Sequence, residues 1–321
     1  MGATLSNFKQ TVWPTLLQAL PPKSKFTADD IPDLTGRIVI VTGGNVGIGY
    51  ETVKVLLKHN AKVYLAARGK DKAERAIKSL KEATGKEAIF LQLDLASLSS
   101  VKKAAEEFLS RESELHILFN NAGVMAPPIE QVTADGYDMQ WGTNVVGHYY
   151  FTVLLLPALL AGVKSSPDHH ARVITTASSR AYSHTLHWET FKDTPERRKT
   201  SRVGLYPQSK FGNVVFARQL AKRYAEQGII SVSVNPGNIK SELQRHLAGL
   251  QKKLVNLLLY PTPLGAITQL YAGTAPEALN YNGEFFIPWA RVGRCRAEAY
   301  DDELGDKLWK WLEAEVKVHQ A

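Results

Sequence analysis

A tyrosine and a lysine four positions apart are the residues of this sequence best suited to acid–base chemistry. They stand in the run Tyr206-Pro207-Gln208-Ser209-Lys210. In a helix, side chains at this spacing share one face, and Pro207 is tolerated if it lies in the first helical turn. A free phenol, with a pKa of about 10, is a weak acid or base at neutral pH, and a nearby ammonium stabilises its phenolate. The pair can therefore transfer protons, although the spacing alone also fits a solvated helix face.

A serine pair and an asparagine could complete such a site. Ser178 and Ser179 follow the predicted strand Arg172–Ala177, and ligands of parallel sheets lie outside the carboxyl ends of the strands. A serine there can hydrogen-bond a substrate oxygen. Asn144 lies in a helix that we predict over Gly136–Leu160. By itself, an asparagine at that point indicates a polar surface position or a kink.

A glycine-rich turn joins the first predicted strand, Arg37–Thr42, to a predicted helix over Ile48–Lys58. Gly43 lets the chain turn sharply, Gly47 allows a pyrophosphate to approach the backbone, and Gly49 permits tight helix–strand packing. The helix N-terminus adds free N–H groups and a positive dipole end. This strand–turn–helix context predicts a dinucleotide cradle. Its other members are Asn45, Val46 and Ile48.

Arg68 lies directly after the second predicted strand, Lys62–Ala67, and 19 positions after Gly49. Selectivity for the adenosine ribose is read about 20 residues beyond such a cradle. An acidic residue there favours NAD, whereas a guanidinium suits the 2′-phosphate of NADP(H). We therefore expect NADP(H), with NAD less favoured, while a solvated surface arginine is the other interpretation of Arg68.

The pattern of the whole chain predicts a scaffold that brings these strand ends together. Short β-branched runs alternate with longer helical patterns from residue 34 onward, which is typical of a parallel sheet with right-handed crossovers. The strands are apolar almost throughout, as expected when both faces of a sheet are covered. The expected strands are Arg37–Thr42, Lys62–Ala67, Ala88–Leu93, Ile117–Asn121, Arg172–Ala177, Ile229–Asn235 and Glu284–Ile287. The expected helices are Ile48–Lys58, Asp71–Glu82, Leu98–Ser110, Gly136–Leu160 and Ser209–Gln227, with a terminal helix near Glu298–Val318.

The spacing Gly43-x-x-x-Gly47-x-Gly49, followed in order by the other motifs, resembles the short-chain dehydrogenase/reductase family over about residues 34–288. The resemblance implies an α/β, Rossmann-type, doubly wound parallel sheet of seven strands in the order 3-2-1-4-5-6-7, with helices on both faces. It implies an N-terminal arm over residues 1–33, one catalytic domain over 34–288, and a C-terminal tail and helix over 289–321. Residues 180–205 and 240–263 are excursions of that domain that would cover the substrate.

The resemblance also implies catalytic roles. Tyr206 is the general acid/base, and Lys210 lowers its pKa and holds the nicotinamide ribose. Ser179 orients the substrate oxygen, with Ser178 as the alternative. Asn144 holds a water that passes protons to Lys210.

Further residues are assigned to the cofactor by the same resemblance. Contacts to the adenine and to the nicotinamide come from the ends of the later strands. These residues are Asp94 and Leu95 after the third strand, Asn121, Ala122 and Gly123 after the fourth, and Pro236, Gly237, Ile239 and Ser241 after the sixth.

The interval of 27 positions between Ser179 and Tyr206 is longer than the family usually has. In this the chain is most similar to the retinol-dehydrogenase and WW-domain-oxidoreductase-like branch. We expect an apolar substrate pocket under the two excursions, lined by Tyr182, Trp188, Leu243 and Leu247.

The expected activity is therefore that of an NADP-dependent alcohol dehydrogenase or carbonyl reductase, acting by hydride transfer. The alternative is a non-catalytic NADP(H)-binding redox sensor or scaffold on the same fold. Such proteins typically lose the Tyr/Lys pair, which this chain retains.

Composition excludes several classes and leaves others open. With 44% hydrophobic and 22% charged residues the chain is of ordinary globular type. The formal charge of +8 permits anionic partners, but the basic run Arg197-Arg198-Lys199 fits a solvated loop better than a nucleic-acid site. The single cysteine, Cys295, cannot form an internal disulfide.

Location and assembly follow from weaker patterns. The sequence has no apolar run of about 20 residues, so we expect no transmembrane helix. A cytoplasmic location is favoured, with weak membrane association through the N-terminal arm as the alternative. We expect no metal site, because the chain's histidines lack a matching ligand pattern. Family resemblance favours a homodimer through the fourth and fifth helices, unless the terminal segments block it.

Overall fold

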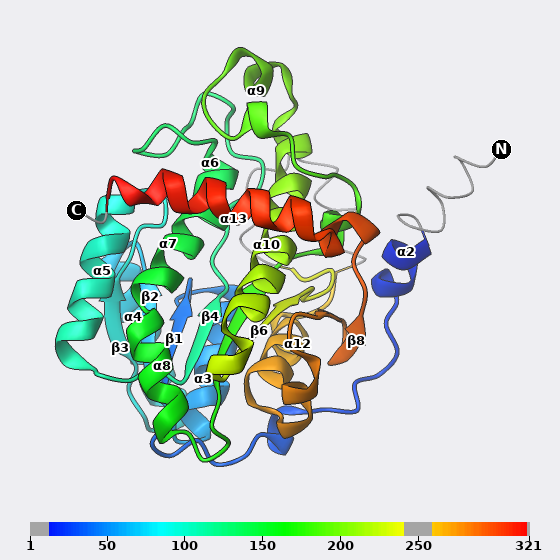
Figure 1. The fold of residues 1–321 in the computed structure, drawn as a ribbon. Helices are drawn as coiled ribbons and strands as arrows, with labels where there is room; N and C mark the ends of the chain where they lie inside the picture. The colour runs from blue at the N-terminus through cyan, green and yellow to red at the C-terminus, as the bar shows by residue number, and fades with distance from the viewer. Residues whose placement is uncertain (1–12, 241–258, 320–321) are drawn as a thin grey trace.

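The computed structural model describes residues 13–240 and 259–319. At its centre lies an eight-stranded sheet in the order β3-β2-β1-β4-β5-β6-β7-β8 (Figure 1). The first seven strands are parallel, as predicted and in the predicted order, whereas β8 pairs antiparallel with β7 and was not predicted. Each of the seven predicted strands is found with its ends displaced by no more than one residue. The strands are β1 (Ile38–Thr42), β2 (Lys62–Ala67), β3 (Ile89–Gln92), β4 (Ile117–Asn120), β5 (Ala171–Thr176), β6 (Ile229–Val234), β7 (Phe285–Ile287) and β8 (Arg291–Gly293).

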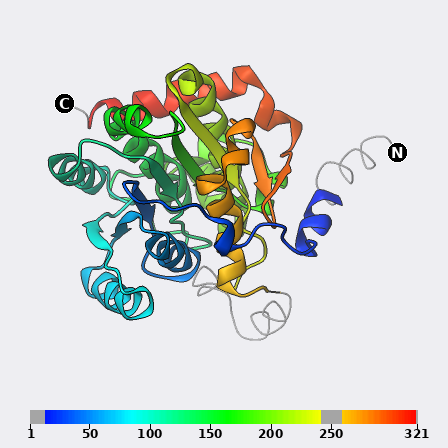
Figure 2. The ribbon, with the colours of Figure 1, turned by 90° about the horizontal axis from the view of Figure 1, so that it is seen from below.

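Helices cover both faces of this sheet, as the apolar strands predicted (Figure 2). Alternate strand residues enter separate hydrophobic clusters, so that Ile40 packs on one face while Val39 and Val41 pack on the other. The cluster around Val39 includes residues of α3 (Gly47–Lys58), α4 (Lys70–Thr84) and α12 (Thr262–Thr274). The cluster around Ile40 includes residues of α5 (Leu98–Arg111), α7 (Gly147–Leu154), α8 (Leu156–Ser165) and α10 (Arg202–Tyr224).

The long helix predicted over Gly136–Leu160 is interrupted twice. It begins later, with α6 (Met139–Trp141), passes through a π-helical turn over Gly142–Val146, and continues as α7. The second interruption, at Leu155, separates α7 from α8 by a bend of 58°. In the described part of the chain no single helix is long and apolar enough to cross a membrane, and this bent pair is a candidate by length and composition only.

α10 starts at Arg202, seven residues before the predicted start, and its N-cap Ser201 accepts a hydrogen bond from the Gly204 amide. Pro207 therefore lies inside the helix rather than in its first turn, which corrects the sequence-based expectation. A proline there leaves the carbonyl four residues earlier without its helical partner. Most of α10 is nevertheless buried, so tertiary packing outweighs this local cost.

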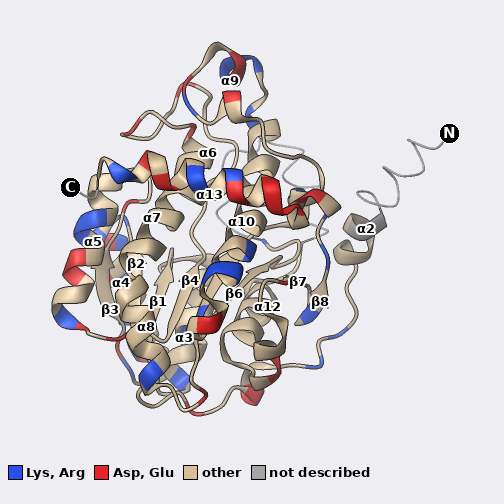
Figure 3. Cartoon of the chain, viewed as in Figure 1, with Lys and Arg blue, Asp and Glu red and all other residues tan. Residues whose placement is uncertain are grey.

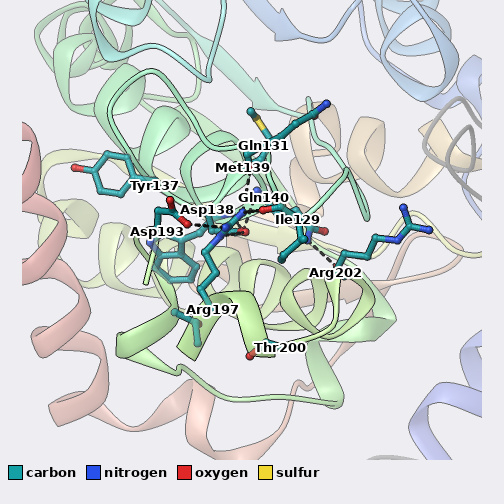
Figure 4. A network of polar contacts seen from close by, with 12 residues as sticks. Ile129, Gln131, Tyr137, Asp138, Met139, Gln140, Asp193, Arg197, Thr200 and Arg202 are labelled. Atoms are coloured by element: carbon teal, nitrogen blue, oxygen red, sulfur yellow. Dashed lines mark hydrogen bonds and ion pairs between the residues drawn. The ribbon is translucent and has the colours of Figure 1, made fainter. Parts of the chain in front are cut away.

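A buried arginine holds the excursion over residues 180–205 against the rest of the domain. The sequence predicts a solvated loop for the basic run that contains this arginine. Arg197 belongs to α9 (Pro195–Lys199), is 1% exposed, and donates through Nε to Asp138 at 2.9 Å. Its Nη1 lies 3.0 Å from Asp193, and its Nη2 donates to the carbonyls of Ile129 and Gln131 (Figure 4). The neighbouring Arg198 is exposed, so only part of the basic run faces solvent.

The predicted terminal helix is confirmed as α13 (Asp302–Lys317), which lies across α7 and α10 (Figure 1). Trp309 packs edge-on against Tyr149 of α7, with ring centroids 5.2 Å apart. Trp311 packs against Phe191 of the 180–205 excursion at 5.0 Å. The helix thus covers the outer face of the α7/α10 layer.

Candidate active site

The ends of β1 and β4 are joined at Thr42, which fixes the two loops of the candidate cofactor site. The Thr42 hydroxyl oxygen accepts hydrogen bonds from the amides of Asn121 and Ala122, both at 2.9 Å. The Asn121 side chain donates to the Thr42 carbonyl at 2.8 Å. The structure thus brings the Asn121-Ala122-Gly123 segment beside the glycine-rich turn, as the sequence predicted.

The glycine-rich turn has the geometry of a phosphate cradle. Gly43 and Gly47 have φ angles of +66° and +56°, which favour glycine. A Cβ on Gly49 would lie 2.3 Å from the Gly43 carbonyl oxygen, so only glycine fits where α3 meets β1. No side chain caps the N-terminus of α3, and its first amides are therefore available to an anion. These residues fit the phosphates of a dinucleotide.

Tyr206 and Lys210 lie on one face of α10 and are 7% and 3% exposed. The Lys210 Nζ is 5.8 Å from the centre of the Tyr206 ring and donates to the Thr176 carbonyl at 2.7 Å. A Cβ on Gly123 would lie 3.5 Å from this Nζ. The pair is therefore next to the Asn121–Gly123 segment, at the carboxyl edge of the sheet.

Burial sets the acid–base properties of both groups. It lowers the pKa of Lys210 to about 7, because the ammonium loses its hydration. Burial also raises the pKa of Tyr206 to about 12, although a hydrogen bond with Ser178 and the charge of Arg180 act in the lowering direction. We had expected Lys210 to lower the tyrosine pKa. That effect of Lys210 stays a prediction; the net pKa of Tyr206 is raised because desolvation of the phenolate outweighs the Ser178 hydrogen bond and the charge of Arg180.

The serine that hydrogen-bonds Tyr206 is Ser178. Its hydroxyl oxygen also accepts from the Arg180 amide at 3.2 Å. Ser179 begins the 3₁₀ turn over Ser179–Tyr182 that follows β5. The geometry therefore favours the alternative, Ser178, as the hydroxyl next to the phenol.

Asn144 is fully buried in the π-helical turn, within which sequence analysis had allowed a kink. Its Oδ1 accepts from the Val124 amide at 2.9 Å, and its Nδ2 donates to the Val124 carbonyl and to the Ser209 hydroxyl. π-Helical turns are frequent at functional sites. Here the turn lets Asn144 hold the strand-end segment against the helix that carries Lys210.

His148 joins the same network and was missed by sequence reasoning. Its Nδ1 lies 3.0 Å from the Asn144 carbonyl oxygen and must donate to it, so its Nε2 accepts from the Thr42 hydroxyl at 2.9 Å. Burial lowers the pKa of His148 to about 3, which keeps the ring neutral. The signal in the sequence was its position one helical turn after Asn144.

The residues predicted to contact the adenosine lie at the ends of β2 and β3. Arg68 is exposed and, among the described residues, forms no ion pair. One Asp94 oxygen accepts from the Ala96 amide at 3.0 Å. Leu95 is buried, and its carbonyl lies against Gly147 of α7, where a Cβ would come within 2.5 Å. The Arg68 guanidinium is thus free to meet a phosphate.

The segment after β6 begins with Asn235, Pro236 and Gly237. Gly237 has a φ of +85°, and its amide donates to the Asn235 side chain at 3.0 Å. Ile239 is 5% exposed, and both it and Ile48 of the cradle lie against Gly265. The segment therefore lies next to the phosphate cradle, while its predicted contact with the nicotinamide stays a prediction and Ser241 lies outside the described residues.

Two of the four predicted substrate residues, Tyr182 and Trp188, lie in the described part of the chain. Tyr182 is 2% exposed and donates to the Arg294 carbonyl at 2.6 Å. Trp188 packs on Phe191, and Lys307 of α13 lies 4.5 Å above its ring. Tyr182 is thus buried and Trp188 half-buried, and their contact with substrate stays a prediction. Leu243 and Leu247 lie outside the described residues.

Residues 13–240 and 259–319, which the structure describes, contain no group of three or more His, Cys, Asp or Glu residues placed to hold a metal ion. His184 and His187 lie side by side, with ring centroids 5.8 Å apart. Cys295 is buried, and burial raises the pKa of its thiol to about 12.

Known proteins that resemble this chain include short-chain dehydrogenases/reductases. A family model described as short chain dehydrogenase matches residues 37–191. A short-chain dehydrogenase/reductase of Armillaria gallica is 59% identical over 305 residues, which are 95% of this chain and 98% of that protein. Among solved structures, an uncharacterized protein from Mycobacterium paratuberculosis is 28% identical with a TM-score of 0.72, covering 92% of this chain and 98% of that one. The Pseudomonas aeruginosa RhlG/NADP complex is 26% identical with a TM-score of 0.63, covering 80% and 95%.

Proposed function

The chain belongs to the short-chain dehydrogenase/reductase family, and on this premise we propose that it interconverts a carbonyl and an alcohol with Tyr206 as general acid/base. The observation that carries this proposal is the buried Tyr206–Lys210 pair, with Nζ 5.8 Å from the ring centre. The pair lies at the sheet edge that also carries the phosphate cradle. A proton donor and a dinucleotide site next to each other are what such a reaction needs.

When bound, the nicotinamide cofactor supplies the hydride that adds to the carbonyl carbon. The carbonyl π bond breaks, and its oxygen takes the proton that the Tyr206 hydroxyl donates. A serine hydroxyl orients that oxygen and stabilises its developing charge. Lys210 then returns a proton to Tyr206, and Asn144 keeps Lys210 and the Val124 segment in place.

At neutral pH the Tyr206 hydroxyl is in the protonated form that the reductive step needs. A phenol whose pKa is raised to about 12 is protonated and ready to donate. Alcohol oxidation needs the phenolate instead, so its rate should rise with pH. Comparison of the two pH profiles tests this assignment.

NADP(H) is the cofactor that we propose, with Arg68 as the residue that binds its 2′-phosphate. An exposed guanidinium at the end of β2 supports this choice, because it can form paired, charge-assisted hydrogen bonds with a phosphate. The related RhlG structure is a complex with NADP, which agrees with the proposal.

The substrate that we propose is a small, apolar carbonyl compound or alcohol. The long interval between Ser179 and Tyr206 supports placing the chain near the retinol-dehydrogenase and WW-domain-oxidoreductase-like branch, whereas the matched relatives are fungal short-chain dehydrogenases/reductases. A panel of aliphatic, aromatic and terpenoid carbonyls, each with NADPH and with NADH, tests substrate and cofactor together.

A redox sensor or scaffold that binds NADP(H) without turnover is the competing function. The panel distinguishes the two when Tyr206→Phe is run beside the wild type. Turnover that the substitution removes, with NADPH binding retained, supports the enzyme. NADPH binding without turnover on any substrate supports the sensor.

We propose a cytoplasmic monomer, in place of the homodimer that family resemblance favoured. The packing of α13 on the α7/α10 face, where Trp309 contacts Tyr149 of α7 and Phe216 of α10, supports the monomer. Figure 3 shows acidic and basic residues interleaved along α5 and α13. Light scattering should return the mass of one chain, 35.5 kDa, and a mass twice as large would contradict the monomer.

A further inference from the structure

The side chain of Gln18, in the N-terminal helix α2 (Trp13–Ala19), is buried. Gln18 is 3% exposed, whereas the adjacent Leu17 is 53% exposed and Leu20 is 78% exposed. Burial of a polar amide is costly unless hydrogen bonds compensate for the lost water. A glutamine that is buried next to an exposed leucine is therefore expected to make specific contacts.

Both ends of the Gln18 amide are hydrogen-bonded inside the protein. Its Nε2 donates to the Tyr182 hydroxyl at 3.0 Å, and its Oε1 accepts from Asn235 Nδ2 at 2.7 Å. These partners stand 164 and 217 positions further along the chain. Tyr182 follows β5 and the serine pair, and Asn235 follows β6. One amide thus connects the segments that follow β5 and β6 at the carboxyl edge of the sheet.

Through Asn235, Gln18 is connected to the Asn235-Pro236-Gly237 turn, which we propose binds the cofactor. Asn235 is 2% exposed, and its Oδ1 accepts from the Gly237 amide at 3.0 Å. Gly237 has a φ of +85° and packs closely against Trp289, so this turn has little room to rearrange. Without Gln18, the buried Nδ2 of Asn235 would lose its partner, and the amide would have to rotate to regain water. That rotation would weaken the hydrogen bond between the Asn235 side chain and the Gly237 amide.

We infer that helix α2 contributes to the active site through Gln18, a positioning residue that holds the Asn235-Pro236-Gly237 turn in its nicotinamide-binding form. The inference rests on the proposed function. Gln18, which precedes the catalytic domain in the chain, should therefore affect only the nicotinamide half of the cofactor site. The adenosine half, at Arg68 and Asp94, belongs to strands that Gln18 does not contact.

Two ligands separate the halves of the cofactor site. NADPH occupies both halves, whereas 2′,5′-ADP carries the adenosine and its 2′-phosphate without a nicotinamide. Gln18→Met keeps the length of the side chain and removes both hydrogen bonds, and Leu17→Ala on the exposed side of α2 is the matched control. We expect Gln18→Met to weaken NADPH binding about tenfold and to leave 2′,5′-ADP binding unchanged. Leu17→Ala should alter neither.

A second variant keeps the test independent of how well Gln18→Met folds. Tyr182→Phe removes the hydroxyl that receives Gln18 Nε2 and keeps the ring in place; we expect it to weaken NADPH binding about threefold. Unchanged NADPH binding in both variants overturns the inference, as does an equal loss for NADPH and 2′,5′-ADP. Wild-type protein that binds neither ligand overturns the proposed function and this inference with it.

Discussion

Replacing Lys210 by methionine should abolish activity and yet stabilise the protein without cofactor at neutral pH. The lysine is 3% exposed, and burial lowers its pKa from 10.5 to about 7. At about 1.4 kcal/mol per pKa unit, the folded state gives up about 5 kcal/mol of stability at low pH by burying this group. Its hydrogen bond to the Thr176 carbonyl returns about 1–3 kcal/mol. That carbonyl keeps a second donor, Asn213 Nδ2 at 3.1 Å, after the substitution. We therefore expect Lys210→Met to be more stable by about 2 kcal/mol at pH 7.

The stability of the wild type relative to Lys210→Met should change with pH, because Lys210 titrates at different pH in the folded and unfolded states. Between the folded pKa of about 7 and the unfolded value of 10.5, the unfolded chain binds more protons at this lysine than the folded protein does. Stability of the wild type therefore rises with pH across that window. The loss of stability caused by burying the Lys210 ammonium is complete below pH 7 and absent above pH 10.5. The stability difference between Lys210→Met and the wild type therefore shrinks by about 1.4 kcal/mol per pH unit from pH 7 to pH 10.5.

Urea unfolding followed by tryptophan fluorescence at pH 7, 8 and 9 measures this difference. Lys222→Met, at an exposed lysine of the same helix, is the control, and its effect should stay within about 1 kcal/mol at every pH. A Lys210→Met protein that is less stable than the wild type by the same amount at pH 7 and pH 9 would refute the reasoning.

Three further predictions concern single side chains. Arg197→Met should destabilise the fold by about 3–5 kcal/mol because it leaves Asp138 buried without its cation, whereas Arg198→Met should change stability by less than about 1 kcal/mol; equal effects in urea unfolding would contradict the buried pair. Arg68→Ala should weaken NADPH binding about tenfold or more and leave NADH binding nearly unchanged, and a retained preference for NADPH would overturn the cofactor assignment. Ser178→Ala should lower kcat by about 100-fold or more if its hydroxyl contacts the reacting oxygen; a larger loss in Ser179→Ala would return that role to Ser179.

The sheet and the cradle could be predicted because their signals are local. Seven strands were predicted to within one residue, since each is a short apolar run covered on both sides. The cradle was predicted because Gly43, Gly47 and Gly49 each meet a separate backbone requirement within one turn. Such requirements depend on neighbours a few positions away and are therefore visible in sequence.

The features that were missed depend on partners far along the chain. Arg197 resembled a solvated cation because its partner Asp138 is 59 positions earlier. Gln18 reads as an ordinary helix residue until Tyr182 and Asn235 are placed beside it. The raised pKa of Tyr206 follows from burial of α10 as a whole, which the spacing of two residues does not encode.

Transfer of deuterium from the nicotinamide C4 position to a carbonyl carbon tests the central claim most directly. The experiment incubates wild type and Tyr206→Phe with C4-deuterated NADPH and the best substrate of the panel, and measures deuterium in the alcohol product by mass spectrometry. Titration of NADPH fluorescence checks that both proteins bind the cofactor. We predict deuterium at the carbinol carbon with the wild type, and product formation by Tyr206→Phe lower by about 100-fold or more. Equal product formation by the two proteins, or NADPH binding by the wild type without transfer to any carbonyl, would contradict the account.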